Sequence, residues 1–151
     1  MTAKEYLNQA YQIDRQIQVI RGKIDKMRDI ATYKSPQFED NGSRTVGNNS
    51  TENKILKFVE YESKQEELIN NLIDKRNEIE QAINRLADPV QREILERRYL
   101  LYQPWESHYD AVSGQYVKGI AESMGYSKRR IFQLHGEALK NIALNCIELH
   151  L

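Results

Sequence analysis

The residues with the clearest chemical meaning are a short cationic run, Lys128-Arg129-Arg130, and the amide of Gln133. A guanidinium can donate two hydrogen bonds to guanine, and a side-chain amide can pair with adenine. Arg129 and Gln133 are four residues apart, so a helix would present both on one face. We expect these two side chains to face bases, and Lys128 and Arg130 to face phosphates, which position a protein without specifying sequence.

The basic charge is local. The chain has 22 basic and 22 acidic side chains, a net charge of zero, and therefore exerts no global attraction for nucleic acid or anionic lipid. The segment 127–140 nevertheless carries a net charge of +3, four cations minus Glu137. Three further cations are expected to extend this patch: Arg97, Arg98 and Lys118.

The stretch 117–136 has the residue pattern of a helix-turn-helix. Ala121 is small enough for two helices to cross closely, and Gly125 can take the positive φ of a sharp turn. Ser127 is a suitable N-cap for the second helix. Four apolar positions are expected to hold the helix pair together: Ile120, Met124, Ile131 and Leu134.

The outward positions are the predicted DNA-binding residues. A recognition helix lies in the major groove with its N-terminal residues nearest the base edges. The predicted contacts are Ser127, Lys128, Arg129, Arg130, Phe132, Gln133 and Gly136, with Lys118 from the preceding segment.

The elements that position this motif begin with two long helices. Apolar residues recur at alternating spacings of four and three along a first helix over 6–31, a heptad seam: Tyr6, Ala10, Ile13, Ile17, Ile20, Ile24, Met27 and Ala31. Residues 32–51 hold turn-forming residues and little to bury, and predict a mobile loop. Thr51 is expected to cap the helix that follows.

The heptad period returns over 55–86, with polar interruptions: Ile55, Phe58, Glu62, Gln65, Ile69, Leu72, Arg76, Ile79, Ile83 and Leu86. Two helices with one apolar stripe each can bury those stripes on one another. We expect residues 1–87 to form a long, antiparallel, coiled-coil-like helical hairpin. Pairing with a second copy to form a four-helix homodimer would also bury the apolar stripes.

A second domain is predicted over 88–151, because Asp88-Pro89 has the chemistry of a helix start. Helices are expected over 89–102, 116–124 and 127–147, and no long strand alternation is present, so the fold class is all-α. Cys146 is expected to be a small buried residue. Tyr99, Tyr116 and Tyr126 are expected at buried edges with their hydroxyls reaching outward.

The residue pattern does not indicate an enzyme. His108, His135 and His150 are scattered without metal-ligand spacing, and no phosphate-binding loop or nucleophile set is present, so no cofactor is expected. His135 is expected to be solvated or capping. The lone cysteine excludes an internal disulfide, and no apolar run is long enough to span a membrane, which favours a cytoplasmic protein.

The chain resembles small proteins of Gram-positive phages and prophages related to ArpU-type and RinA-type late transcriptional regulators. The resemblance rests on a series of matching positions in the C-terminal half and extends to the opening residues 2–7. The matching positions are Asp88-Pro89, 96–100, Ile120-Ala121, 124–127, Ile131, 134–136 and 138–139. The C-terminal half is similar to the fourth region of bacterial sigma factors. The resemblance implies a transcription regulator that binds double-stranded DNA and contacts RNA polymerase.

One departure from that family is an insert at 107–119. Relatives pass directly from the Trp-Glu pair to Ile-Ala, whereas here thirteen residues separate Glu106 from Ile120. The insert is expected to form a longer loop or a small hairpin, and Trp105 to pack in the core. Two other functions stay open: a small terminase-like packaging subunit, and a protein-binding module that acts on RNA polymerase without touching DNA.

Overall fold

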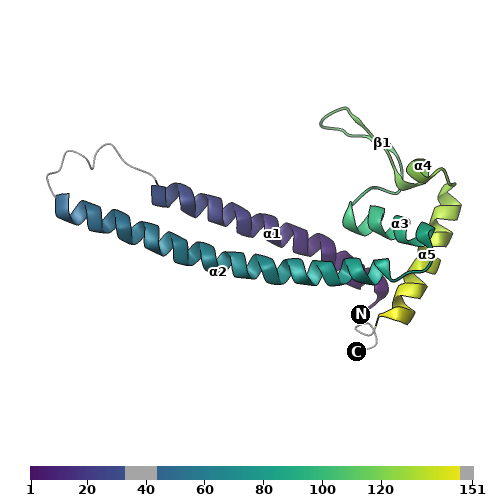
Figure 1. The fold of residues 1–151 in the computed structure, drawn as a ribbon. Helices are drawn as coiled ribbons and strands as arrows, with labels where there is room; N and C mark the ends of the chain where they lie inside the picture. The colour runs from purple at the N-terminus through teal and green to yellow at the C-terminus, as the bar shows by residue number, and fades with distance from the viewer. Residues whose placement is uncertain (33–43, 147–151) are drawn as a thin grey trace. The chain divides into compact units, whose positions relative to one another are not determined.

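The computed structural model describes residues 1–32 and 44–146, and for 44–50 the backbone only. The described residues are mostly helical with one two-stranded sheet, which confirms the all-α expectation at this level (Figure 1). The elements are α1 (Ala3–Thr32), α2 (Arg44–Asn84), α3 (Pro89–Leu95), the π-helix η2 (Glu96–Leu100), β1 (His108–Tyr109), β2 (Tyr116–Val117), α4 (Ile120–Met124) and α5 (Lys128–Asn145). No helix in the described ranges is long and apolar enough to cross a membrane.

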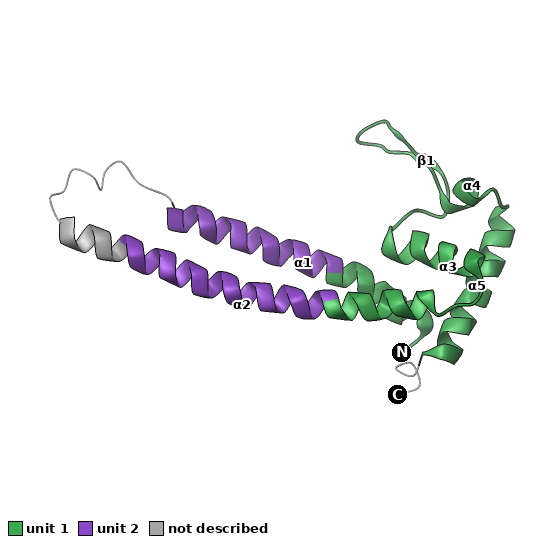
Figure 2. Cartoon of the chain, viewed as in Figure 1, with its two compact units in different colours: residues 1–13, 74–151 green, residues 14–73 purple. Residues whose placement is uncertain are grey.

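The chain divides into two compact units (Figure 2). Unit 1 comprises residues 1–13 and 74–151, and unit 2 comprises residues 14–73. The first turns of α1 and the end of α2 therefore belong with the C-terminal helices. The division into compact units does not coincide with the predicted domain boundary between residues 87 and 88. That boundary stays a prediction.

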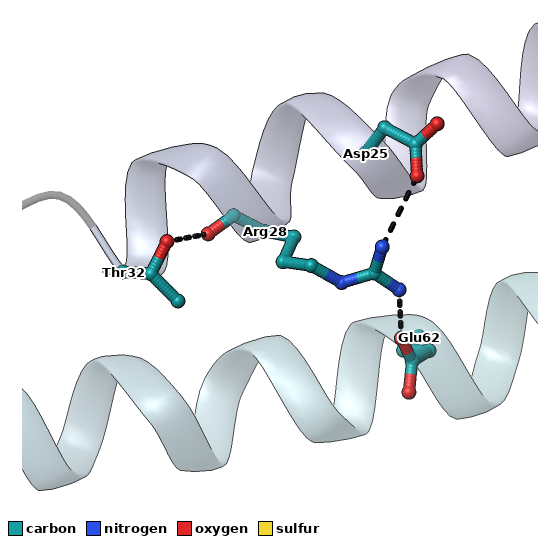
Figure 3. A network of polar contacts seen from close by, with 4 residues as sticks. All are labelled: Asp25, Arg28, Thr32 and Glu62. Carbon is teal, nitrogen blue, oxygen red and sulfur yellow. Dashed lines mark hydrogen bonds and ion pairs between the residues drawn. The ribbon is translucent and has the colours of Figure 1, made fainter.

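In unit 2, α1 and α2 lie side by side (Figure 1). Ile17, Ile20 and Ile24 of α1 and Ile69 of α2 are buried. The guanidinium of Arg28 links the two helices, with nitrogen atoms 3.2 Å from Asp25 Oδ1 and 3.1 Å from Glu62 Oε2 (Figure 3). Both ion pairs are largely exposed to solvent. The buried isoleucines therefore contribute more to stability than the ion pairs.

The first heptad seam agrees with the observed burial better than the second, of whose ten predicted members four are buried. In α1 every seam residue from Tyr6 to Ile24 is buried, whereas Met27 is exposed. Of the second seam, Ile69, Ile79 and Ile83 of α2 are buried, as is Leu86 just after the helix, whereas Ile55 is 47% exposed.

The predicted loop at 32–51 is wrong in its second half. Helix α2 already begins at Arg44, so Thr51 lies inside the helix and is not its N-cap. No proline interrupts 44–51, and extending an existing helix costs far less than nucleating a new one, so weak helix formers are tolerated there. Residues 33–43 lie outside the described residues.

Unit 1 is organised around the contact between α3 and α5. Asp88 caps α3 by accepting a hydrogen bond of 2.9 Å from the Val90 N–H, and Pro89 takes the first helical position, as predicted. A side-chain hydrogen bond of 2.8 Å from Asn141 Nδ2 to the buried Gln91 Oε1 joins the two helices. This bond satisfies a polar group that would otherwise be costly to bury.

The helix predicted over 89–102 is an α-helix only as far as Leu95 and ends as a π-helix. Helix α3 passes into η2, and the Leu101 N–H donates to Glu96 O at 2.9 Å, a bond spanning five residues. This wider turn places Tyr99 and Leu100 in the core and leaves Leu101 70% exposed. Tyr102 then takes φ +58°, a left-handed conformation that is uncommon for a non-glycine residue and ends the helix.

The insert forms a small hairpin. Strands β1 and β2 pair antiparallel, with His108 opposite Val117 and Tyr109 opposite Tyr116. The helix predicted to start at residue 116 therefore starts at Ile120 instead, because the preceding residues are engaged in the strand ladder. Tyr116 and Tyr126 are exposed, so their predicted burial is wrong, whereas Tyr99 and Cys146 are buried as predicted.

Candidate nucleic-acid interface

A tight turn joins α4 to α5. Gly125 adopts φ +72°, the left-handed conformation expected of it, and the Tyr126 N–H donates to Ala121 O at 3.1 Å. Ser127 then caps α5, because its hydroxyl oxygen accepts from the Arg130 N–H at 3.2 Å. The chain reverses within a few residues and begins an 18-residue helix at Lys128.

The predicted inward positions hold this pair of helices together. Ile120, Ile131 and Leu134 form a buried cluster with Ile94 of α3. The partly buried side chains packed against the cluster are Val90, Trp105, Ala121 and Met124. The burial predicted for Ile120, Ile131 and Leu134 is confirmed, whereas Met124 is only partly buried. Trp105 packs against the cluster, as predicted.

The predicted outward positions at the start of α5 are exposed. Ser127, Lys128, Arg129, Arg130 and Gln133 all face solvent. An Arg130 guanidinium nitrogen lies 3.0 Å from Gln133 Oε1, so these two side chains already form a hydrogen bond along the helix. The first turns of α5 thus concentrate three cations at the end of a helix whose free N–H groups also favour an anion.

The remaining predicted contacts differ in their surroundings. Phe132 is 42% exposed, and its ring centroid lies 5.2 Å from that of Trp105, so one side of the ring is held in the fold. Gly136 is partly buried, yet a Cβ there would meet no atom within 4 Å. Lys118 is exposed directly after β2, and its carbonyl oxygen accepts from Gln103 Nε2 at 3.0 Å.

Arg97 and Arg98, expected to extend the basic patch, are engaged within unit 1. Arg97 forms an ion pair of 3.0 Å with Glu93 and donates to Gln103 Oε1 at 3.1 Å. Arg98 donates to the Gln103 carbonyl oxygen, and its guanidinium lies 4.8 Å from the Trp105 ring centroid. Both side chains are partly buried and hold the segment after η2 in place.

His135 is not solvated, contrary to the expectation. Its imidazole stacks on Tyr99, with Nε2 2.8 Å from the Tyr99 hydroxyl, and meets Trp105 edge to face at 4.7 Å. Burial lowers the pKa of His135 to about 4, and the positive charges of Lys4 and Arg98 act in the same direction. His135 is therefore neutral at physiological pH and belongs to the core beneath the exposed face of α5.

The cations have acidic neighbours that were not predicted from the sequence. Glu106 forms an ion pair with Lys128, the first residue of α5. Glu122 accepts hydrogen bonds from the Ser107 and Tyr116 hydroxyls, which hold its pKa below the ordinary value, and the nearby charge of Lys118 adds to this effect. No local sequence pattern predicts either arrangement, because the hairpin brings together residues that are far apart along the chain.

No group of three or more histidine, cysteine, aspartate or glutamate side chains within the described ranges is arranged to hold a metal ion. Comparison with protein-family models, with curated proteins and with solved structures found no match for this chain.

Proposed function

We propose that this chain is a sequence-specific DNA-binding transcription regulator, of the kind found in phages and prophages and similar to the fourth region of sigma factors. It acts by binding rather than by catalysis, in the cytoplasm, with double-stranded DNA and RNA polymerase as partners. In this proposal α4, the Gly125 turn and α5 are a helix-turn-helix, and α5 is the recognition helix.

The observation that carries the proposal is the division of α5 into two faces. Ile131, Leu134 and Ala138 are buried, whereas the cationic run 128–130 and Gln133 are exposed on the first turns. A recognition helix needs a fixed inner face and outer side chains that can donate to base edges and phosphates. Arg129 is the best candidate for a base contact, because Lys128 and Arg130 already have polar partners in the fold.

We also propose that α1 and α2 form a helical hairpin that pairs with a second copy. Unit 2 leaves several large apolar side chains exposed: Val19, Met27, Ile30, Ile55, Leu56, Val59 and Leu68. Association with an identical hairpin would remove apolar surface from water at about 25 cal/mol per Å². A homodimer would also place two recognition helices on one duplex, as two half-sites require.

The test is selection of preferred sites from a pool of random 30-base-pair duplexes, followed by binding of the best site over a salt series. Arg129→Ala is compared with Arg85→Ala, which removes an exposed cation just after α2. Loss of a base-reading arginine should weaken binding to the preferred site by about 1–3 kcal/mol and reduce discrimination against other sites. Failure to enrich any sequence, or equal effects of the two variants, would refute sequence-specific binding through α5.

One observation favours the second candidate, a protein-binding module that acts on RNA polymerase without DNA contact. The β-hairpin of β1 and β2 exposes Tyr109, Val112 and Tyr116 to solvent. No lysine or arginine occurs between residues 99 and 117. Exposed tyrosines without cations suit a protein surface better than a phosphate backbone. Under this alternative, polymerase capture would survive Arg129→Ala and fail with Tyr109→Ser. A packaging subunit would instead form a ring, which the mass in solution would reveal.

A further inference from the structure

The cation at the start of the proposed recognition helix is already neutralised within the fold. Lys128 Nζ forms an ion pair with Glu106, and both side chains are 62% exposed. The same ammonium lies 5.9 Å from the Phe132 ring centroid. An approaching phosphate would therefore have to displace a carboxylate from Lys128, and would also meet the negative charge of Glu106.

Glu106 is held in this position from both sides. Its neighbour Trp105 packs against the buried cluster of α3, α4 and α5. On the other side Gly119 approaches so closely that a Cβ there would stand 2.5 Å from the Glu106 carbonyl carbon. The Gly119 N–H also donates to Ser107 Oγ at 2.8 Å, which ties the two ends of the hairpin together. The backbone of Glu106, which carries the carboxylate, is consequently held in place.

We propose that Glu106 limits the affinity of this protein for DNA by competing with phosphate for Lys128. This inference rests on the proposed function and adds a residue that sets its strength. The β-hairpin of β1 and β2 brings the chain back to Glu106. Gly119, which follows β2, thereby fixes the backbone of Glu106 beside the first turn of α5. Lys128 is thereby available to DNA only at the expense of an internal ion pair.

The test uses the full chain and a preferred duplex of 30 base pairs, with dissociation constants measured over a salt series. Glu106→Gln removes the competing charge and keeps the side chain's size. Glu78→Gln is the matched control, because it makes the same change of net charge at an exposed position of α2 in unit 1. An exposed ion pair is worth little, so Glu106→Gln should bind about two- to fivefold more tightly than Glu78→Gln. The salt dependence should steepen by about 0.9 for the added phosphate contact.

Lys128→Gln separates this mechanism from general repulsion. In a Lys128→Gln background, adding Glu106→Gln should have no more effect than adding Glu78→Gln. A gain in affinity that persists without Lys128, or no gain with Glu106→Gln alone, would overturn the proposal while Arg129-dependent binding keeps the proposed function intact. Absence of binding by every variant, including the unmodified chain, would overturn both.

Discussion

Gly119→Ala should disrupt the junction between the hairpin and α4. The added methyl group would lie 2.5 Å from the Glu106 carbonyl carbon, 2.6 Å from the Ser107 nitrogen and 2.8 Å from Glu106 Cα. All three atoms belong to the backbone, so no side chain can rotate away to make room. The close approach is therefore relieved only by moving the ends of the hairpin apart.

The cost follows from what holds those ends together. The Gly119 N–H donates to Ser107 Oγ at 2.8 Å, and the next residue, Ile120, donates from its N–H to the Pro104 carbonyl at 2.9 Å. Ile120 is fully buried, so a displaced Gly119 also disturbs the core. Overpacking of this kind costs about 1–3 kcal/mol. For a chain of this size, that corresponds to a fall in Tm of roughly 2–12 °C.

Thermal unfolding followed by circular dichroism measures the loss of stability, and fluorescence locates it. Trp105 is the only tryptophan and directly precedes Glu106, so its emission reports on this junction. Gly119→Ala should shift the emission to longer wavelength, because the indole loses part of its cover. Gly22→Ala is the control, since a Cβ at that position in α1 meets no atom within 4 Å.

Gly22→Ala should raise stability by about 0.5–1 kcal/mol, because alanine favours a helix interior over glycine. It should leave the tryptophan emission unchanged. If Gly119→Ala kept the Tm and the emission of the unmodified protein, the close packing of Gly119 on Glu106 would be wrong. The positioning argument for Glu106 would then fail with it.

Three further predictions concern other parts of the chain. Gln65→Leu should raise the urea midpoint by an amount equivalent to about 1–2 kcal/mol, because Gln65 Oε1 is buried with no hydrogen-bond partner within the described structure; a lower midpoint would show that the amide has a polar partner. His135 has a folded-state pKa of about 4, below its unfolded value of about 6.5. Its contribution to the free energy of unfolding is therefore complete above pH 6.5 and is lost as the pH falls toward 4. His135→Gln should flatten the pH dependence of the free energy of unfolding between pH 6.5 and 4, and an unchanged slope would contradict the burial of a neutral imidazole. Gly136→Ala should stabilise α5 by about 0.5–1 kcal/mol and weaken binding to the selected duplex, whereas unaltered affinity would place this part of α5 away from the DNA.

The helical framework could be predicted because its signals are local. The seam from Tyr6 to Ile24, the Asp88-Pro89 start and the positive φ of Gly125 each follow from side-chain periodicity or from the conformational limits of single residues. The buried and exposed faces of α5 follow from the same 3.6-residue period. The start of α2 at Arg44 could not be predicted, because the local turn propensity of 44–51 is weaker than the gain from extending an existing helix.

The sequence by itself determined which residues of the candidate interface are apolar and which are charged, and hence which face of α5 is turned inward. Only the tertiary structure decided what those charges meet. Lys128 pairs with Glu106, Arg98 is held over Trp105, and His135 is buried against Tyr99. In each pair the two residues come from different segments of the chain, and the pairings depend on the path of the β-hairpin and of η2. Residue periodicity describes one helix at a time, whereas electrostatic partners are chosen by the distances between elements.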